Sequence, residues 1–174
     1  MFDKINIKII LKDHFDTFSD VAGNTCVSDY VCFILCPVAI ACISIYFRYG
    51  ISTDAISALI NFGSITTALL LSVLMLVFDQ DRKLVKDTDK FYERKKVLFQ
   101  ELYSNICYSV IASISLVLAC LLNIVFGNTW IPIIEASISI AFFTPFIIFI
   151  SCNLILTIFM VTKRIYATLT IDKP

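Results

Sequence analysis

Four apolar stretches, each free of lysine and arginine, constrain this chain more than any other feature of its sequence. A helix needs about 20 apolar residues to cross the roughly 30 Å hydrocarbon core of a bilayer. The stretches that reach or approach this length are 30–47, 55–78, 102–126 and 133–161. The sequence therefore predicts an all-α, polytopic membrane protein with four transmembrane helices.

Composition supports this class and argues against several others. Hydrophobic residues make up 59% of the chain and charged residues 16%, against roughly 45–50% and 25% in soluble domains. The formal net charge is zero, so no basic excess indicates direct nucleic-acid binding. One histidine and four glycines leave little material for metal sites, phosphate loops or His-based catalysis. We expect neither enzymatic activity nor a cofactor.

The distribution of lysine and arginine predicts the orientation. Residues 1–29 form an amino-terminal tail, 30–166 the transmembrane domain, 79–101 its middle segment and 167–174 a carboxy-terminal tail. Arg48 is the one basic residue on the side of the two short connections, whereas the other 13 lie in or next to the tails and the middle segment. Since positive charge is retained in the cytoplasm, both termini and the middle segment are predicted to be cytoplasmic.

The middle segment carries a heptad pattern. Leu84, Phe91 and Leu98 recur every seven residues, which is typical of a stripe on a helix. The pattern predicts that spans two and three extend into the cytoplasm as an antiparallel helical pair. The stripe would then contact a partner protein or another subunit, and the alternative is a solvated charged loop.

The amino-terminal tail is open to two interpretations. Ile5, Ile7 and Ile9 alternate with polar residues as in a strand, whose one available partner would be 168–171. Lys4, Lys8 and Lys12 instead share one face of a helix, and we favour a short helix at the membrane interface. His14, which has aspartates near it, is expected to be a solvated tail residue.

The most informative pattern lies on the second span. Its polar and small residues fall within an arc of about 80° on a helix. They are Asp54, Ser57, Asn61, Ser64, Ala68 and Ser72. Such a stripe either lines a path for water or ions, or forms a seam where helices pack closely. The third span has a weaker counterpart, which we expect to pack against the first stripe; its members are Asn105, Ser109, Ala112, Cys120 and Asn123.

Three charged residues gather near the outer boundary: Arg48, Asp54 and Glu135. An acid close to lipid is costly unless it is paired. One hypothesis is that Arg48 neutralises one of the acids and fixes the outer helix ends. The other is that Asp54 and Glu135, repeated around an oligomer, form an acidic mouth that attracts cations.

The assembled pattern resembles small four-span proteins of bacterial phage-exclusion systems, of the RexB type and of the KwaA type found in Kiwa defence. The resemblance lies in the span order, the short turn before 53–78, the basic segment 81–96 and the turn at 130–132. It implies a homo-oligomer in the bacterial inner membrane, with no catalytic residues. The expected function is the membrane component of an antiphage or abortive-infection system, acting as an ion-leak effector or membrane sensor. The alternative is a non-conducting adaptor that recruits a cytoplasmic partner.

Overall fold

The computed structural model describes residues 7–16, 31–84, 92–127, 130–131 and 136–170. These residues are almost entirely helical, as the sequence predicts. The helices are α1 (Ile7–Asp16), α3 (Cys36–Tyr46), α4 (Thr53–Leu84), α5 (Tyr92–Phe126) and α6 (Thr144–Thr170), with π-helical turns at Val31–Leu35 and Ser139–Phe143. A short antiparallel ladder joins β1 (Trp130–Ile131) to β2 (Ala136–Ser137).

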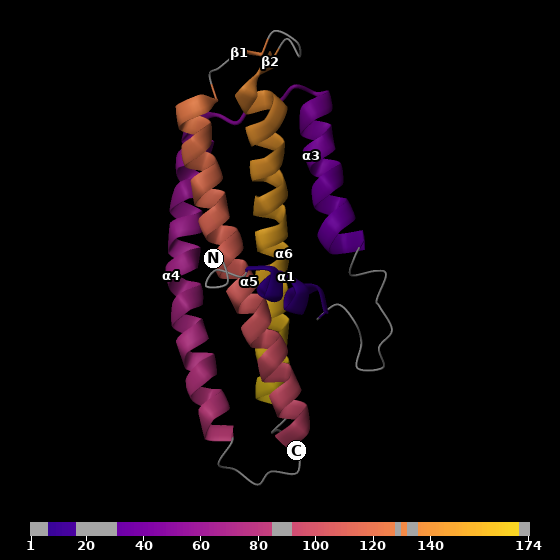
Figure 1. Cartoon of the computed structure of the whole chain (residues 1–174), viewed down its shortest axis with the longest axis vertical. Coiled ribbons are helices and arrows are strands. Elements are labelled where there is room, and N and C mark those ends of the chain that lie inside the picture. The colour runs from indigo at the N-terminus through magenta and orange to yellow at the C-terminus, as the bar shows by residue number, and fades with distance from the viewer. Residues whose placement is uncertain (1–6, 17–30, 85–91, 128–129, 132–135, 171–174) are drawn as a thin grey trace.

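Helix α5 is the centre of the bundle. It packs between α4 on one side and α6 on the other, and α3 lies against α6 (Figure 1). The short α1 lies across α5 rather than along it (Figure 1). We call the end where residues 47–52 join α3 to α4 the turn end, and the end where residues 85–91 follow α4 the linker end.

Three helical segments are long and apolar enough to cross a membrane: Thr53–Gln80, Lys96–Phe126 and Ser139–Ala167. They correspond to the second, third and fourth predicted spans. The first predicted span, 30–47, forms a shorter apolar helix, Val31–Tyr46. The predicted start of the last span at 133 is wrong, because Ala136 and Ser137 pair with β1 before the helix begins.

Two expectations about the polar segments are confirmed. Helix α4 continues to Leu84 and α5 begins at Tyr92, so both extend beyond their predicted spans as an antiparallel pair. The tail forms a helix at Ile7–Asp16, as favoured. The strand alternative is wrong, since α6 runs on through Thr170 and holds the proposed partner segment in a helix.

Two buried prolines coincide with the places where the helical pitch changes. Pro37 follows the π-helical turn Val31–Leu35, and Pro145 follows the turn Ser139–Phe143. Proline has no N–H to donate to the preceding turn, so a wider turn before it is tolerated. Both helices therefore become regular only after their proline.

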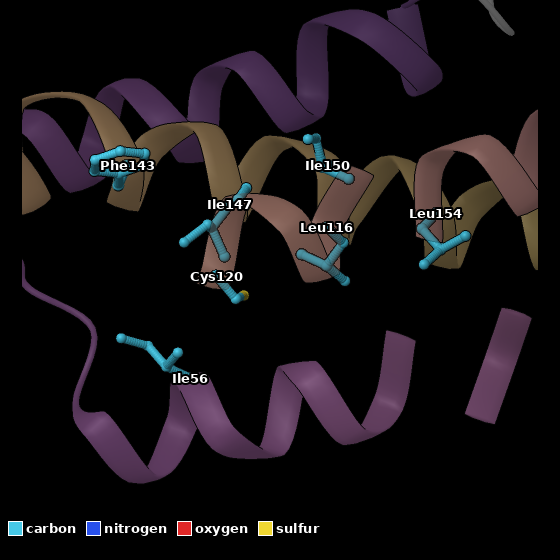
Figure 2. Close-up of a cluster of buried hydrophobic side chains, with 8 residues drawn as sticks. Ile56, Leu116, Cys120, Phe143, Ile147, Ile150 and Leu154 are labelled. Atoms are coloured by element: carbon cyan, nitrogen blue, oxygen red, sulfur yellow. The ribbon is translucent and has the colours of Figure 1, made fainter. Parts of the chain in front are cut away.

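The buried side chains form two clusters along the bundle. The cluster nearer the turn end joins α4, α5 and α6, and Figure 2 shows Ile56 of α4 facing Leu116 and Cys120 of α5. The other cluster lies nearer the linker end, around Leu102 and Ile106 of α5. In lipid, burial itself gives little driving force between helices, so close packing and hydrogen bonds become the main sources of specificity.

Candidate functional site

The polar stripe of α4 lies on the outer surface of the bundle. Its six residues, Asp54, Ser57, Asn61, Ser64, Ala68 and Ser72, are all exposed. The buried residues of this helix, such as Ile56, Leu70 and Val77, lie on the other side, about 160° away at 100° per residue. We call the six residues the polar face of α4. Within one chain, this face packs against no other described helix.

The serines of the polar face form hydrogen bonds within their own helix. The hydroxyl of Ser57 donates to the carbonyl of Thr53 at 3.1 Å, and that of Ser64 donates to Ile60 at 2.8 Å. Ser72 does the same with Ala68 at 3.0 Å. Asn61 differs, because its amide has no hydrogen bond to any residue that the structure describes. Asp54 also has no such bond but lies in the first turn of α4, so Asn61 is the residue deeper along this face whose bonding capacity is open to an outside partner.

The polar residues of α5 do not meet this face, contrary to expectation. Asn105, Ser109, Cys120 and Asn123 are buried, as a packing surface should be, and Ala112 is half-buried. Asn105 contacts His14 of α1, whereas Cys120 lies in a cluster with Ile56 on the apolar side of α4, so neither meets the polar face of α4. The spacing identified a packing surface correctly, but it carried no information about which neighbour would cover it.

A different pair of polar residues joins α4 to α5. The hydroxyls of Thr67 and Ser113 lie 2.7 Å apart and share a hydrogen bond. One turn earlier, Gly63 lets the two backbones approach, since an added Cβ would lie 2.7 Å from Val117 Cγ2 and 3.3 Å from the Ser113 carbonyl oxygen. This close approach fixes the orientation of α4, and so turns its polar face outward.

An open groove of about 380 Å³ runs beside the polar face. It lies between α4 and α5 and is lined by Ser64, Thr67, Ile114, Val117, Leu118 and Leu121. Ser64 belongs both to the groove and to the polar face. The groove and the face therefore form one continuous surface, in which small polar groups stand next to an apolar hollow.

The expectation that His14 is a solvated tail residue is wrong. Its side chain is only 1% exposed, and its Nδ1 lies 2.7 Å from the Asn105 side-chain oxygen. The imidazole also stacks on the Tyr108 ring, with centroids 3.8 Å apart and planes 4° from parallel. His14 therefore fastens α1 to α5 by one hydrogen bond and one aromatic stack.

The same cluster continues to α6 and to the first apolar helix. The Tyr108 hydroxyl donates to the Asn153 side-chain oxygen at 2.7 Å. The Asn153 amide in turn donates to the carbonyl of Phe33, in the π-helical turn before α3, at 2.9 Å. Segments more than 100 residues apart in the sequence are thus joined at one level of the bundle.

Burial of His14 favours its neutral form. Desolvation lowers the pKa of His14 from 6.5 to about 4, the bond to Asn105 opposes this shift, and the positive charge of Arg164 adds to it. Arg164 itself forms an ion pair with Glu101 at 3.3 Å, which joins α5 to α6 next to the cluster. Near neutral pH the imidazole is therefore an uncharged hydrogen-bonding and stacking group.

One signal in the sequence could have revealed this cluster. Ile7, Ile10 and His14 are spaced by three and four residues, so the apolar face of the first helix continues through the histidine. A histidine in that register is expected to face the same neighbour as the isoleucines. Composition alone, with aspartates on both sides, favoured the wrong interpretation.

Of the three charged residues predicted to lie near the outer boundary, the structure describes two. Arg48 and Asp54 are exposed, and the structure describes no ion pair between them. Arg48 has a φ of 52°, the left-handed conformation that ends α3, and the N–H of Tyr49 bonds back to the carbonyl of Ser44 at 2.9 Å. Glu135 lies outside the described residues, so both hypotheses for these charges stay predictions.

The heptad stripe of the middle segment is likewise mostly outside the described residues. Leu98 is half-buried on α5. Phe91 is not described, and of Leu84 only the backbone is, at the end of α4. A contact of this stripe with a partner or a second subunit stays a prediction.

Comparisons with known proteins add no identification. No protein-family model, no curated protein and no solved structure matches the chain. Within the described residues, no three His, Cys, Asp or Glu side chains come together as metal ligands would. The chemistry that the described surfaces offer is hydrogen bonding and charge at a membrane, at the polar face of α4 and around His14.

Proposed function

We propose that this chain is a multi-pass protein of the bacterial inner membrane, with four crossings and both termini cytoplasmic. Three helices have the length and composition of spans. The fourth crossing would be Val31–Tyr46, about 24 Å long at 1.5 Å per residue, which is slightly short for a 30 Å core and requires local thinning. The excess of lysine and arginine at the linker end supports its cytoplasmic placement.

The level of α1 is consistent with this placement. Asn105, which bonds His14, is 21 residues along α5 from Phe126, or about 32 Å from the turn end. If the turn end stands at one edge of the hydrocarbon, α1 lies at the other edge. Lys8 and Lys12 of this helix are exposed there, where they suit an interfacial helix beneath the membrane.

The observation that carries the functional proposal is the outward polar face of α4. Asn61 is eight residues from Thr53, about 12 Å inside the membrane from the turn end. An amide without a partner in hydrocarbon costs several kcal/mol. We infer that the chain is a homo-oligomer whose α4 helices meet through this face, which removes Asn61 from lipid.

Our leading hypothesis for the role of this oligomer is the membrane component of an antiphage or abortive-infection system. The defence role comes from the resemblance described above, and the polar face supplies its physical means. A ring of polar faces would enclose a water-lined path through which ions leak when infection triggers it. A membrane sensor would use the same interface without conduction.

One observation favours the alternative, a non-conducting adaptor. Because Ser57, Ser64 and Ser72 donate to their own backbone, these hydroxyls need no water to be satisfied. Small residues at this spacing allow helices to pack closely in a dry seam. In that case the oligomer anchors a cytoplasmic effector or sensor protein, which the linker end would bind.

The test compares wild type with Asn61→Leu, and uses Phe62→Leu as a matched control. Phe62 is the next residue, 38% exposed, and lies outside the polar face. Each protein is reconstituted in liposomes for ion flux and cross-linked for oligomer size. The same variants are expressed in bacteria, and phage plaques are counted.

Each outcome separates the hypotheses. Lost flux and lost protection with an unchanged oligomer would support the leak effector. A weaker oligomer in Asn61→Leu alone, with no flux in wild type, would support the adaptor. A wild type that stays monomeric in liposomes would overturn the assembly through α4, and unchanged plaque numbers in wild type would overturn the defence role.

A further inference from the structure

Helix α4 carries an exposed row of large apolar side chains along one border of its polar face. Three of them are 62–64% exposed within one chain: Ile65, Leu69 and Leu76. By helical position they lie, on average, about 60° to one side of Asn61. We call these three residues the apolar ridge of α4. The polar face is thus bordered on this side by side chains that are free to contact a neighbouring surface.

The groove of about 380 Å³ lies along the opposite border of the polar face. Its wall on α4 is formed by Ser64 and Thr67, about 60° and 120° to the other side of Asn61. Its wall on α5 is entirely apolar and consists of Ile114, Val117, Leu118 and Leu121. Because the ridge and the groove lie on opposite sides of the polar face, the ridge of one chain cannot enter the groove of the same chain.

The ridge and the groove lie at matching depths along the bundle. Ile65 is 12 residues along α4 from Thr53, about 18 Å from the turn end. Ile114 is 12 residues along α5 from Phe126, also about 18 Å from that end. Copies inserted in a membrane in the same orientation are related by an axis along the membrane normal, so side chains that meet across their interface share one depth. A neighbouring copy therefore presents its ridge at the level of the groove.

We propose that the apolar ridge of one copy packs into the groove of the next, so that α4 and α5 join copies head to tail in a ring. This proposal rests on the assembly through α4 proposed above and specifies its geometry. A lipid chain would fill the groove but leave the adjacent Asn61 amide without a partner. A second copy instead covers the groove and shields the polar face from lipid at the same time. An interface between two different surfaces generates a ring when its rotation closes, whereas a two-fold dimer uses one surface twice.

This arrangement determines where the polar face points. The face lies between the ridge and the groove, and both of these contact neighbouring copies. The apolar side of α4 packs on α5 of its own chain, as Figure 2 shows for Ile56 and Cys120. The α4 helices therefore form the inner layer of the ring, and Asn61 of every copy faces the ring axis.

The test uses cysteine cross-linking between two differently tagged copies in one membrane. One copy carries Ile65→Cys and the other Ile114→Cys, both at exposed positions. We expect mild oxidation to give a disulfide-linked pair that carries both tags. Either variant expressed alone should give no more than wild type, whose seven native cysteines set the background. Ile155→Cys replaces Ile114→Cys in the matched control, since Ile155 is exposed on α6 outside the groove, and its mixture with Ile65→Cys should stay at background.

A double variant, Ile65→Cys with Ile114→Cys, tests whether the assembly closes. Each copy then carries both halves of the interface, so successive copies can be linked to one another. We expect a ladder of bands that stops at the number of subunits in the ring. A two-fold assembly would give dimers alone.

Several results would overturn the proposal. Copies with Ile65→Cys that cross-link to one another would show a two-fold contact through the ridge, and a ladder without a fixed end would contradict ring closure. A mixture that stays at background, although amine cross-linking still gives the wild-type oligomer, would mean that lipid or another protein fills the groove. A wild type that is monomeric under amine cross-linking would instead refute the assembly through α4 itself.

Discussion

Acidification is expected to release α1 from the bundle. The docked histidine resists protonation, with a pKa of about 4 compared with 6.5 for a solvated imidazole. This difference corresponds to roughly 3 kcal/mol in favour of the neutral, docked form. Because the undocked helix binds a proton more readily, docking is at full strength above pH 6.5 and weakens progressively as pH falls to about 4.

The assay is direct because His14 is the only histidine. Nitrogen-15 NMR of histidine-labelled protein in nanodiscs reports the pKa of one residue without assignment. Amide exchange of Ile7–Asp16 at pH 7 and pH 5 then reports docking. His14→Phe is the matched variant, since it keeps a ring on Tyr108 but loses the titrating nitrogen and the bond to Asn105. Its docking should not depend on pH over this range.

A measured pKa of 6 or higher would refute the reasoning. It would mean that the imidazole is solvated, or that its protonated form gains a partner that offsets burial. Equal pH dependence of α1 exchange in wild type and His14→Phe would also contradict it, because the effect would then come from another group.

Three further predictions concern packing within the bundle. Gly63→Ala should lower the free energy of unfolding by about 1–3 kcal/mol, because the new methyl group meets the stiff Val117 side chain. An unchanged denaturation midpoint in detergent would argue against this close contact. Tyr108→Phe keeps the stack on His14 but removes the bond to Asn153, which in turn bonds Phe33. The free energy that protects the amides of Val31–Tyr46 from exchange should therefore fall by about 0.6–2 kcal/mol. Exchange at the wild-type rate would show that the bond contributes nothing. Arg48→Gly should be more stable than Arg48→Ala by about 0.4–1 kcal/mol, since both remove the charge but only glycine suits a φ of 52°; equal thermal stability would contradict the left-handed conformation.

The long helices could be predicted because run length alone identifies them. The predicted span 55–78 corresponds to the helical segment Thr53–Gln80, and the predicted span 102–126 corresponds to Lys96–Phe126. The bounds differ where the helix continues through charged residues that an apolar stretch excludes. The start at 133 failed for a local reason, since a two-residue β-ladder precedes the last helix. Hydropathy contains no signal for such a pairing.

The candidate surfaces were harder to predict, because they depend on which helix covers which. The spacing on α4 identified a polar face, yet its exposure follows from the contact of Gly63 with α5. The spacing on α5 identified a buried face, but this face meets α1 at Asn105 and the apolar side of α4 at Cys120 rather than the polar face of α4. His14 was missed because its neighbours Asn105 and Tyr108 lie about 90 residues away in the sequence.

The hydrogen bonds of the polar face imply that assembly through α4 would depend on one residue more than on the whole stripe. Three serines donate to their own backbone, so removing them from lipid gains little. Asn61 has both a donor and an acceptor open on an apolar helix, and an interhelical bond in lipid contributes about 0.6–2 kcal/mol per pair. A ring of subunits repeats that bond at every interface, whereas water along the same face would satisfy the amide without any subunit contact. The difference between an adaptor and a conducting assembly is therefore whether protein or water bonds the Asn61 side chain.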